Sequence, residues 1–199
     1  MKQNNLEKIP EKSAILIIGP PLSNKKDILY KLITSSLGRS EPVLFITTDY
    51  FPSDIEKDLA KNKILFKNYE KKGYLKFLDC YSSQAKSSLS DTTIIKYIPG
   101  PLALSDISVA LSEIESSYHK LSKHQNIIFQ SLSTMLLYSK PEAIERFVQI
   151  IIAKTKNAGG SIFFTIEEGM HDKKVIFGLK HLMDGVIEVK NKKTKLITS

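Results

Sequence analysis

Short apolar runs alternate with longer stretches of helical periodicity along this chain. The first run, residues 14–18, is continuous rather than alternating, which is typical of a strand that is covered on both faces. Helices follow, and the most regular of them is predicted to begin at Ser105. Further strands are predicted at residues 43–46, 75–78, 127–129 and 161–166. This order predicts an α/β fold with a mainly parallel central sheet.

The end of the chain breaks this alternation. Two short apolar runs, residues 186–189 and 195–197, flank a polar turn at residues 191–194, which predicts an antiparallel hairpin at the edge of the sheet. No stretch has the composition of a linker, so residues 1–199 are predicted to form a single domain. Within it, residues 1–8 and 191–199 are expected to be flexible or to lie at the edge.

Composition excludes several classes of protein. No apolar run approaches the roughly 18 residues of a membrane span, and the polar N-terminus lacks the apolar core of a secretion signal, so we expect a cytoplasmic protein with no membrane partner. The single cysteine, Cys80, is expected to be buried and inert. The net charge of +8 comes mainly from lysine. A solvated lysine-rich surface explains it most simply, although contact with nucleic acid stays open.

The loop after the first strand has the setting of a phosphate-binding loop. Such loops follow the pattern G-x-x-x-x-G-K-[ST], in which backbone N–H groups and the lysine hold phosphates and the hydroxyl holds magnesium. Gly19 and Lys25 stand at the first glycine and the lysine, whereas Asn24 replaces the second glycine. Asparagine tolerates positive φ, so we expect the loop to survive that change.

The next position departs further from the pattern, because Lys26 puts a cation where the magnesium ligand belongs. The loop therefore predicts either a nucleotide site without a metal site or a strand–helix turn that holds no ligand. The residues predicted to contact nucleotide are Gly19, Pro20, Ser23, Asn24, Lys25, Lys26 and Asp27.

Several segments resemble the KaiC-like branch of the RecA superfamily of P-loop NTPases. Residues 9–21 resemble the approach to that family's phosphate loop. Residues 127–138 resemble its Walker B strand with the Ser-Leu-Ser-Thr-Leu-Leu sequence after it. The resemblance covers about residues 9 to 190 and implies a RecA-like three-layer fold. The matching segments are residues 9–21, 43–52, 127–138, 157–171 and 181–188.

The resemblance implies ATP chemistry, but the positions that carry this chemistry are altered. The family's Walker B strand ends in an aspartate that orients magnesium, and here the residue is Gln130. Of the family's paired carboxylates that activate water, the first maps to Asp49 and the second to Tyr50. Phosphoryl transfer relies on positioning and metal charge. We therefore interpret Asp49 and Gln130 as vestiges of a catalytic site.

The function expected from these residues is that of a KaiC-like pseudo-ATPase. It would act as a binding or regulatory module with weak or absent ATP hydrolysis, and its partner would be an active paralogue or a second copy of itself. Two alternatives stay open. One is an ATPase with a metal-poor site that binds ATP or ADP without magnesium. The other is a basic RecA paralogue that binds nucleic acid.

Histidines and serines elsewhere in the sequence do not form a recognisable catalytic set. His171 and His181 have no cysteine or third ligand near them in the sequence, so surface or helix-capping roles are expected. Ser131 and Ser133 follow a predicted strand and are interpreted as packing and loop-bonding residues.

Overall fold

The computed structural model describes residues 9–198, apart from residues 63, 86–87 and 191–192. These residues form an eight-stranded sheet with the order β4-β3-β2-β5-β6-β1-β7-β8. The strands from β1 to β7 are parallel to their neighbours, and β8 is antiparallel to β7. The strands are β1 (Ala14–Gly19), β2 (Val43–Thr47), β3 (Leu75–Asp79), β4 (Ile95–Tyr97), β5 (Gln125–Gln130), β6 (Gly160–Glu167), β7 (Gly185–Lys190) and β8 (Lys193–Thr198).

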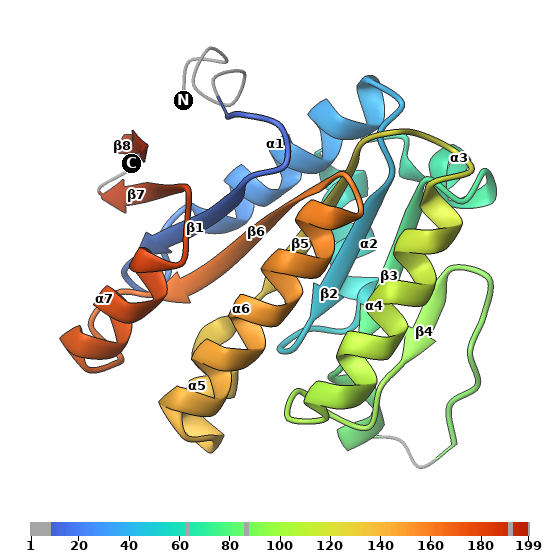
Figure 1. The fold of residues 1–199 in the computed structure, drawn as a ribbon. Helices are drawn as coiled ribbons and strands as arrows, with labels where there is room; N and C mark the ends of the chain where they lie inside the picture. The colour runs from blue at the N-terminus through green and yellow to red at the C-terminus, as the bar shows by residue number, and fades with distance from the viewer. Residues whose placement is uncertain (1–8, 63, 86–87, 191–192, 199) are drawn as a thin grey trace.

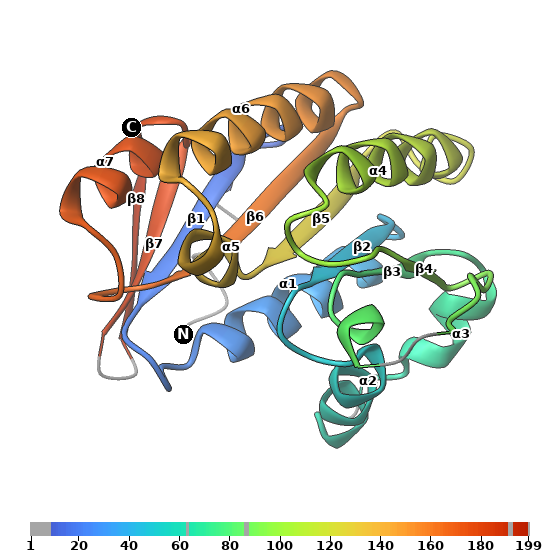
Figure 2. The ribbon, with the colours of Figure 1, turned by 90° about the horizontal axis from the view of Figure 1, so that it is seen from below.

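Helices cover both faces of the sheet (Figures 1 and 2), which gives three layers. One face carries α4, α6 and α7, and the other carries α1, α2 and α3. The helices are α1 (Lys25–Gly38), α2 (Pro52–Lys61), α3 (Phe66–Lys71), α4 (Leu104–Tyr118), α5 (Leu132–Tyr138), α6 (Pro141–Asn157) and α7 (Lys173–His181), with a short 3-10 helix, η2 (Ser82–Gln84).

The continuous apolar run of β1 follows directly from this layering. Leu16 and Ile18 belong to the core beneath α4, α6 and α7, whereas Ile15 and Ile17 belong to the core beneath α1. A strand at the centre of a doubly covered sheet needs apolar side chains on both faces. The predicted α/β fold with a mainly parallel sheet and a C-terminal antiparallel hairpin is confirmed.

Several details differ from the sequence analysis. Helix α4 begins at Leu104 rather than at Ser105. The reason is the turn at Gly100–Ala103, in which the Ala103 N–H donates to the Gly100 carbonyl at 3.2 Å and the helix starts directly after it. The predicted terminal turn is shorter, since Lys193 and Thr194 already pair in β8, while residues 191–192 lie outside the described residues. Elements α3, β4 and α5 were not predicted.

Two smaller expectations concern the segment after β3. Cys80 is buried as predicted, and burial raises the pKa of its thiol, so it is inert. The polar, serine-rich composition of residues 82–93 predicts a long exposed loop, but this segment starts with η2 and a buried Ser82. Ser82 is buried because its N–H and hydroxyl both donate to the Asp79 carboxylate, at 2.9 and 2.5 Å.

Among the described helices, none is long and apolar enough to cross a membrane.

Strand register defines two opposite edges of the sheet. At the carboxyl edge, where the parallel strands end, Gly19 lies beside Glu167 and Thr47 lies beside Gln130. The loops after β1, β2, β5 and β6 therefore meet there, as is usual for ligand sites in open α/β sheets. At the amino edge, β2, β5 and β6 begin.

Candidate functional site

The loop between β1 and α1 bonds mainly to itself. The Ser23 N–H donates to the Pro20 carbonyl at 3.2 Å and closes a turn around Pro21 and Leu22. Leu22 has φ 61, the sign that a type II turn requires at its third residue. The Lys25 N–H donates to the Ser23 carbonyl at 2.8 Å. These two N–H groups therefore face carbonyls of their own loop rather than a space for phosphate.

The Lys25 ammonium is surrounded by acceptors. Its Nζ lies 2.9 Å from the Gly19 carbonyl, 2.7 Å from the Pro20 carbonyl, 2.9 Å from Ser23 Oγ and 2.7 Å from Glu167 Oε2. The Lys25 side chain is 8% exposed. An ammonium has three N–H donors, so these four acceptors use its whole capacity.

Neighbouring strands hold the loop closed. A Cβ added at Gly19 would lie 2.7 Å from the Val189 carbonyl of β7 and 3.0 Å from Ser23 Oγ, which explains why glycine stands there. The Gly19 carbonyl also accepts the Glu168 N–H at 2.8 Å. The loop is therefore packed between β7 and the segment that follows β6.

Lys26 and the residues after β2 form a second cluster. Lys26 Nζ lies 3.5 Å from the centroid of the Tyr50 ring, a cation–π contact. Asp49 Oδ1 accepts hydrogen bonds from Thr134 Oγ1 and from Thr48 Oγ1. Burial raises the pKa of Asp49, against the lowering effect of these hydroxyls and of Lys26. The Asp49 carboxylate is thus already occupied by protein donors.

Gln130 ends β5 as a neutral amide, 7% exposed, with Oε1 3.5 Å from Thr47 Oγ1. Magnesium prefers carboxylate oxygens and an open coordination shell. The groups present at this edge are the Lys26 ammonium, the Gln130 amide and the hydrogen-bonded Asp49. These residues do not fit a magnesium ion.

Two predicted nucleotide contacts lie apart from the rest. Asn24 has φ −74 and makes no side-chain cap, so the loop does not use the tolerance of asparagine for positive φ. The positive φ moves to Leu22 because Pro21 before it fixes the turn. Asp27 is exposed and lines another cavity, with Tyr30 and Lys31 on α1.

A part-buried contact between α5 and the segment around Glu167 was not predicted from the sequence. Ser133 Oγ accepts the Glu167 N–H at 2.8 Å and lies 2.9 Å from His171 Nε2. Burial lowers the pKa of His171, while Glu167 opposes that effect. His171 is therefore a half-buried neighbour of the loop rather than a surface or capping residue. No local pattern could reveal it, because α5 and the segment after β6 meet only in the fold.

The lysine-rich surface of α2 and α3 carries many of its own counter-charges. Carboxylates of the same two helices lie within ion-pair distance of its lysines, which weakens the field that a polyanion would meet. The pairs are Lys57–Asp54 at 2.9 Å, Lys61–Asp58 at 3.4 Å, Lys67–Glu56 at 2.7 Å and Lys67–Glu70 at 3.1 Å.

Comparison with known proteins gives a consistent picture of the family. A family model described as the KaiC ATPase matches residues 4–197. A UPF0273 protein of Methanopyrus kandleri is 26% identical over 194 residues, covering 91% of this chain and 69% of the relative. A UPF0273 protein of Aeropyrum pernix is 19% identical over 182 residues, covering 91% of this chain and 71% of the relative.

Two solved structures share the fold. An uncharacterized protein from Pyrococcus horikoshii, solved in complex with an unknown peptide, matches with a TM-score of 0.75 and 19% identity over 98% of this chain and 86% of that one. A KaiC-like protein from Pyrococcus horikoshii OT3 matches with a TM-score of 0.67 and 16% identity, covering 94% of this chain and 77% of that one.

Proposed function

This chain belongs to the KaiC ATPase family, and we propose that it is a member that does not hydrolyse ATP and acts by binding a protein partner. The carrying observation is the chemistry of three positions at the carboxyl edge. Where the resemblance places a magnesium-binding hydroxyl, a magnesium-orienting aspartate and a pair of water-activating carboxylates, the chain has Lys26, Gln130 and the Asp49–Tyr50 pair. Each change removes a function on which phosphoryl transfer depends.

The state of Lys25 supports the same proposal. An incoming phosphate would compete with the Glu167 carboxylate for the ammonium and would bring a second anion beside it. It would also have to open a loop whose Ser23 and Lys25 N–H groups already have acceptors. Both costs oppose nucleotide binding, so ATP and ADP are expected to bind weakly or not at all.

A binding role is supported by the apolar side chains that follow the sheet's carboxyl edge. Leu22 is fully exposed in the loop after β1, and Met170, 44% exposed, lies in the loop after β6. Phe177 on α7 and Tyr138 on α5 are 74% and 71% exposed. Clusters of exposed apolar residues mark interaction surfaces. A structure with the same fold holds a peptide, which fits a polypeptide partner for this chain.

Phosphate release from Mg-ATP tests the loss of hydrolysis. The purified wild type should release phosphate no faster than the buffer blank, and the Lys25→Met variant, purified in parallel, should match it. Magnesium-dependent release that co-elutes with the protein and disappears in Lys25→Met would refute the proposal.

Peptide selection tests the partner. A random peptide library displayed on phage should yield sequences that bind the wild type and that lose binding to Leu22→Asp and Phe177→Asp. The matched control is Leu65→Asp, which changes another exposed leucine, 78% exposed, next to α3. Selected peptides that bind all four proteins equally would show that the carboxyl edge is not the binding surface.

A further inference from the structure

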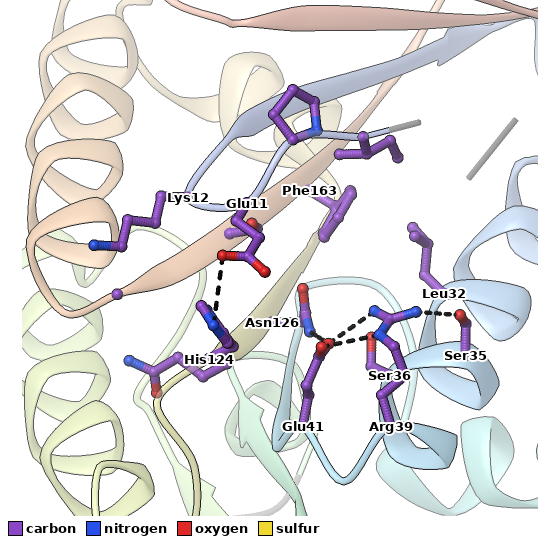
Figure 3. Close-up of a pocket in the computed structure, with 15 residues that line it drawn as sticks. Glu11, Lys12, Leu32, Ser35, Ser36, Arg39, Glu41, His124, Asn126 and Phe163 are labelled. Atoms are coloured by element: carbon purple, nitrogen blue, oxygen red, sulfur yellow. Dashed lines mark hydrogen bonds and ion pairs between the residues drawn. The ribbon is translucent and has the colours of Figure 1, made fainter. Parts of the chain in front are cut away.

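A cavity of about 380 Å³ lies at the amino edge of the sheet, opposite the phosphate-type loop (Figure 3). The segment before β1, the C-terminal half of α1 and the first residues of β5 and β6 line it. Nothing in the proposed function uses this cavity. Its volume is within the range of small-molecule sites.

Apart from Lys12, the charged side chains that line the cavity are matched to one another. Arg39 donates from Nε and NH2 to the two oxygens of Glu41 at 2.9 and 2.7 Å, and Asn126 Nδ2 donates to Glu41 Oε2 at 2.8 Å. Burial acts to raise the pKa of Glu41, but these hydrogen bonds hold it below its ordinary value, so the carboxylate is ionised. His124 Nε2 lies 3.4 Å from Glu11 Oε2 on the other wall. The Lys12 ammonium has no ion-pair partner among the described residues, but its side chain points away from the cavity (Figure 3), so an ionic ligand would find no unmatched opposite charge inside it.

Two amide oxygens of the lining lack hydrogen-bond partners among the described residues. Asn126 is 7% exposed, and while its nitrogen bonds to Glu41, its oxygen points into the cavity (Figure 3). Gln125 is 3% exposed, and its Oε1 is buried without a partner although its Nε2 donates to the Ala158 carbonyl at 3.1 Å. A buried acceptor without a donor is costly. The Asn126 oxygen, which faces the cavity, therefore favours a ligand that brings an N–H donor.

The backbone around the cavity is held in an unfavourable conformation. Lys12, which lines the cavity, has φ 55, and Ser40, between Arg39 and Glu41, has φ 58. Non-glycine residues in this left-handed region cost free energy and concentrate at ligand clamps. Two of the three described non-glycine residues with positive φ thus border one cavity.

Phe163 and Leu32 supply an apolar wall. Both are nearly buried, at 3% and 6% exposed, and both side chains face the cavity (Figure 3). An apolar wall beside a hydrogen-bond acceptor suits a small ring system that packs against the wall and donates an N–H group to the acceptor. We propose that the cavity binds an uncharged planar heterocycle with N–H donors, of nucleobase or nucleoside size, by hydrogen bonds to Asn126 and apolar contact with Leu32 and Phe163.

Three probes of similar size distinguish specific binding at this site from nonspecific binding. Adenine is uncharged at pH 7 and carries N–H donors, caffeine is a planar purine without an N–H group, and benzamidine is a planar cation with N–H donors. Isothermal calorimetry on the full-length wild type should show saturable binding of adenine, with caffeine and benzamidine at least tenfold weaker. Equal binding of caffeine or of benzamidine, or no saturable binding of adenine, overturns the proposal.

An amide-to-alkyl substitution then locates the site. Asn126→Leu keeps the shape and removes the oxygen, so adenine affinity should fall at least tenfold, whereas the control Asn68→Leu on exposed α3 should leave it unchanged. If Asn126→Leu does not fold, wild-type NMR decides: adenine should shift the amide signals of Glu11, Asn126 and Phe163. Shifts confined to residues 19–25 overturn the proposal. Adenine has no phosphate, so its outcome is independent of ATP hydrolysis.

Discussion

At the carboxyl edge of the sheet the polar side chains are paired with one another, whereas at the amino edge several are not. Lys25 has four acceptors within 2.9 Å, and Asp49 has two hydroxyl donors. At the amino edge, the side-chain oxygens of Asn126 and Gln125 have no donor among the described residues. A sequence motif thus marks the edge that is closed, while the edge with open hydrogen-bonding capacity carries no motif.

The difference has a plain physical meaning. The residues at the carboxyl edge make bonds within the fold, and removing a buried group leaves its partners unsatisfied. A group with an unmet hydrogen bond, by contrast, weakens the fold unless a ligand completes it. Whether a polar side chain already has hydrogen-bond partners therefore says more about its availability to a ligand than its residue type does.

Removing Lys25 takes away the donor shared by its acceptors at the carboxyl edge and should have the largest effect on stability. In Lys25→Met, the Glu167 carboxylate and the Pro20 carbonyl lose the donor that the ammonium supplies, so the free energy of unfolding should fall by about 2 kcal/mol. Urea denaturation measures this. The control Lys31→Met, on the exposed side of α1, should change it by less than about 0.5 kcal/mol. Equal stability of Lys25→Met and wild type would show that the ammonium is not held by the fold and is free for phosphate.

Restoring the phosphate-loop motif should allow Mg-ATP to bind at the carboxyl edge. The triple change Asn24→Gly, Lys26→Thr and Gln130→Asp returns the second glycine, the hydroxyl and the magnesium-orienting carboxylate. Saturating Mg-ATP should then raise the melting temperature by several degrees, as ligand binding to the native state does, while the wild type shows no shift. If the triple variant gains no response, the loop has been assigned the wrong positions.

Glu115 tests the cost of unmet polar groups near the amino edge. This α4 residue is 3% exposed, and its Oε1 has no partner among the described residues. Burial raises the pKa of Glu115 above 4.5, so the folded state binds the proton more tightly than the unfolded state. Stability is therefore lost as pH rises from 4.5 through the raised pKa.

Glu115→Gln should remove that loss and stabilise the protein at pH 7 by about 1 kcal/mol, the scale of desolvating one buried group. Urea denaturation at pH 4 and pH 7 checks it: the advantage of the variant should be larger at pH 7. An advantage that is the same at both pH values would show that ionisation of Glu115 plays no part.

Leu22 should give the smallest effect. A leucine at φ 61 is strained and glycine is not, so Leu22→Gly should stabilise the protein, by up to about 1 kcal/mol. Leu65, also exposed but at φ −79, is the matched control, and Leu65→Gly should give no gain. Equal changes in the two variants would mean that the turn around Leu22 stores no strain.

Much of the fold was predictable because it depends on local periodicity. The run at residues 14–18 and the helical stripe of α4 each report burial through the spacing of apolar residues. Element α5 was missed because its seven residues are too few to show a helical period, and β4 because three half-buried residues give no alternation. The start of α4 was misplaced by one residue because backbone bonds, rather than a serine cap, set it.

The site divides in the same way. The place of the loop, the lysine at position 26 and the neutral Gln130 were all legible in the sequence, because a motif fixes position and residue type. The contact of Lys26 with Tyr50 and that of His171 with Ser133 were not, since each joins separate elements of the fold.

By itself, the order of apolar runs and turn residues determined that this chain folds as an α/β sheet with a glycine-led loop after its first strand. The tertiary structure alone decided which groups that loop contacts. The parallel register of β1 and β6 sets Gly19 beside Glu167, and so brings a carboxylate 142 residues away in the chain onto Lys25. Such pairing depends on strand order and register, which no local pattern encodes.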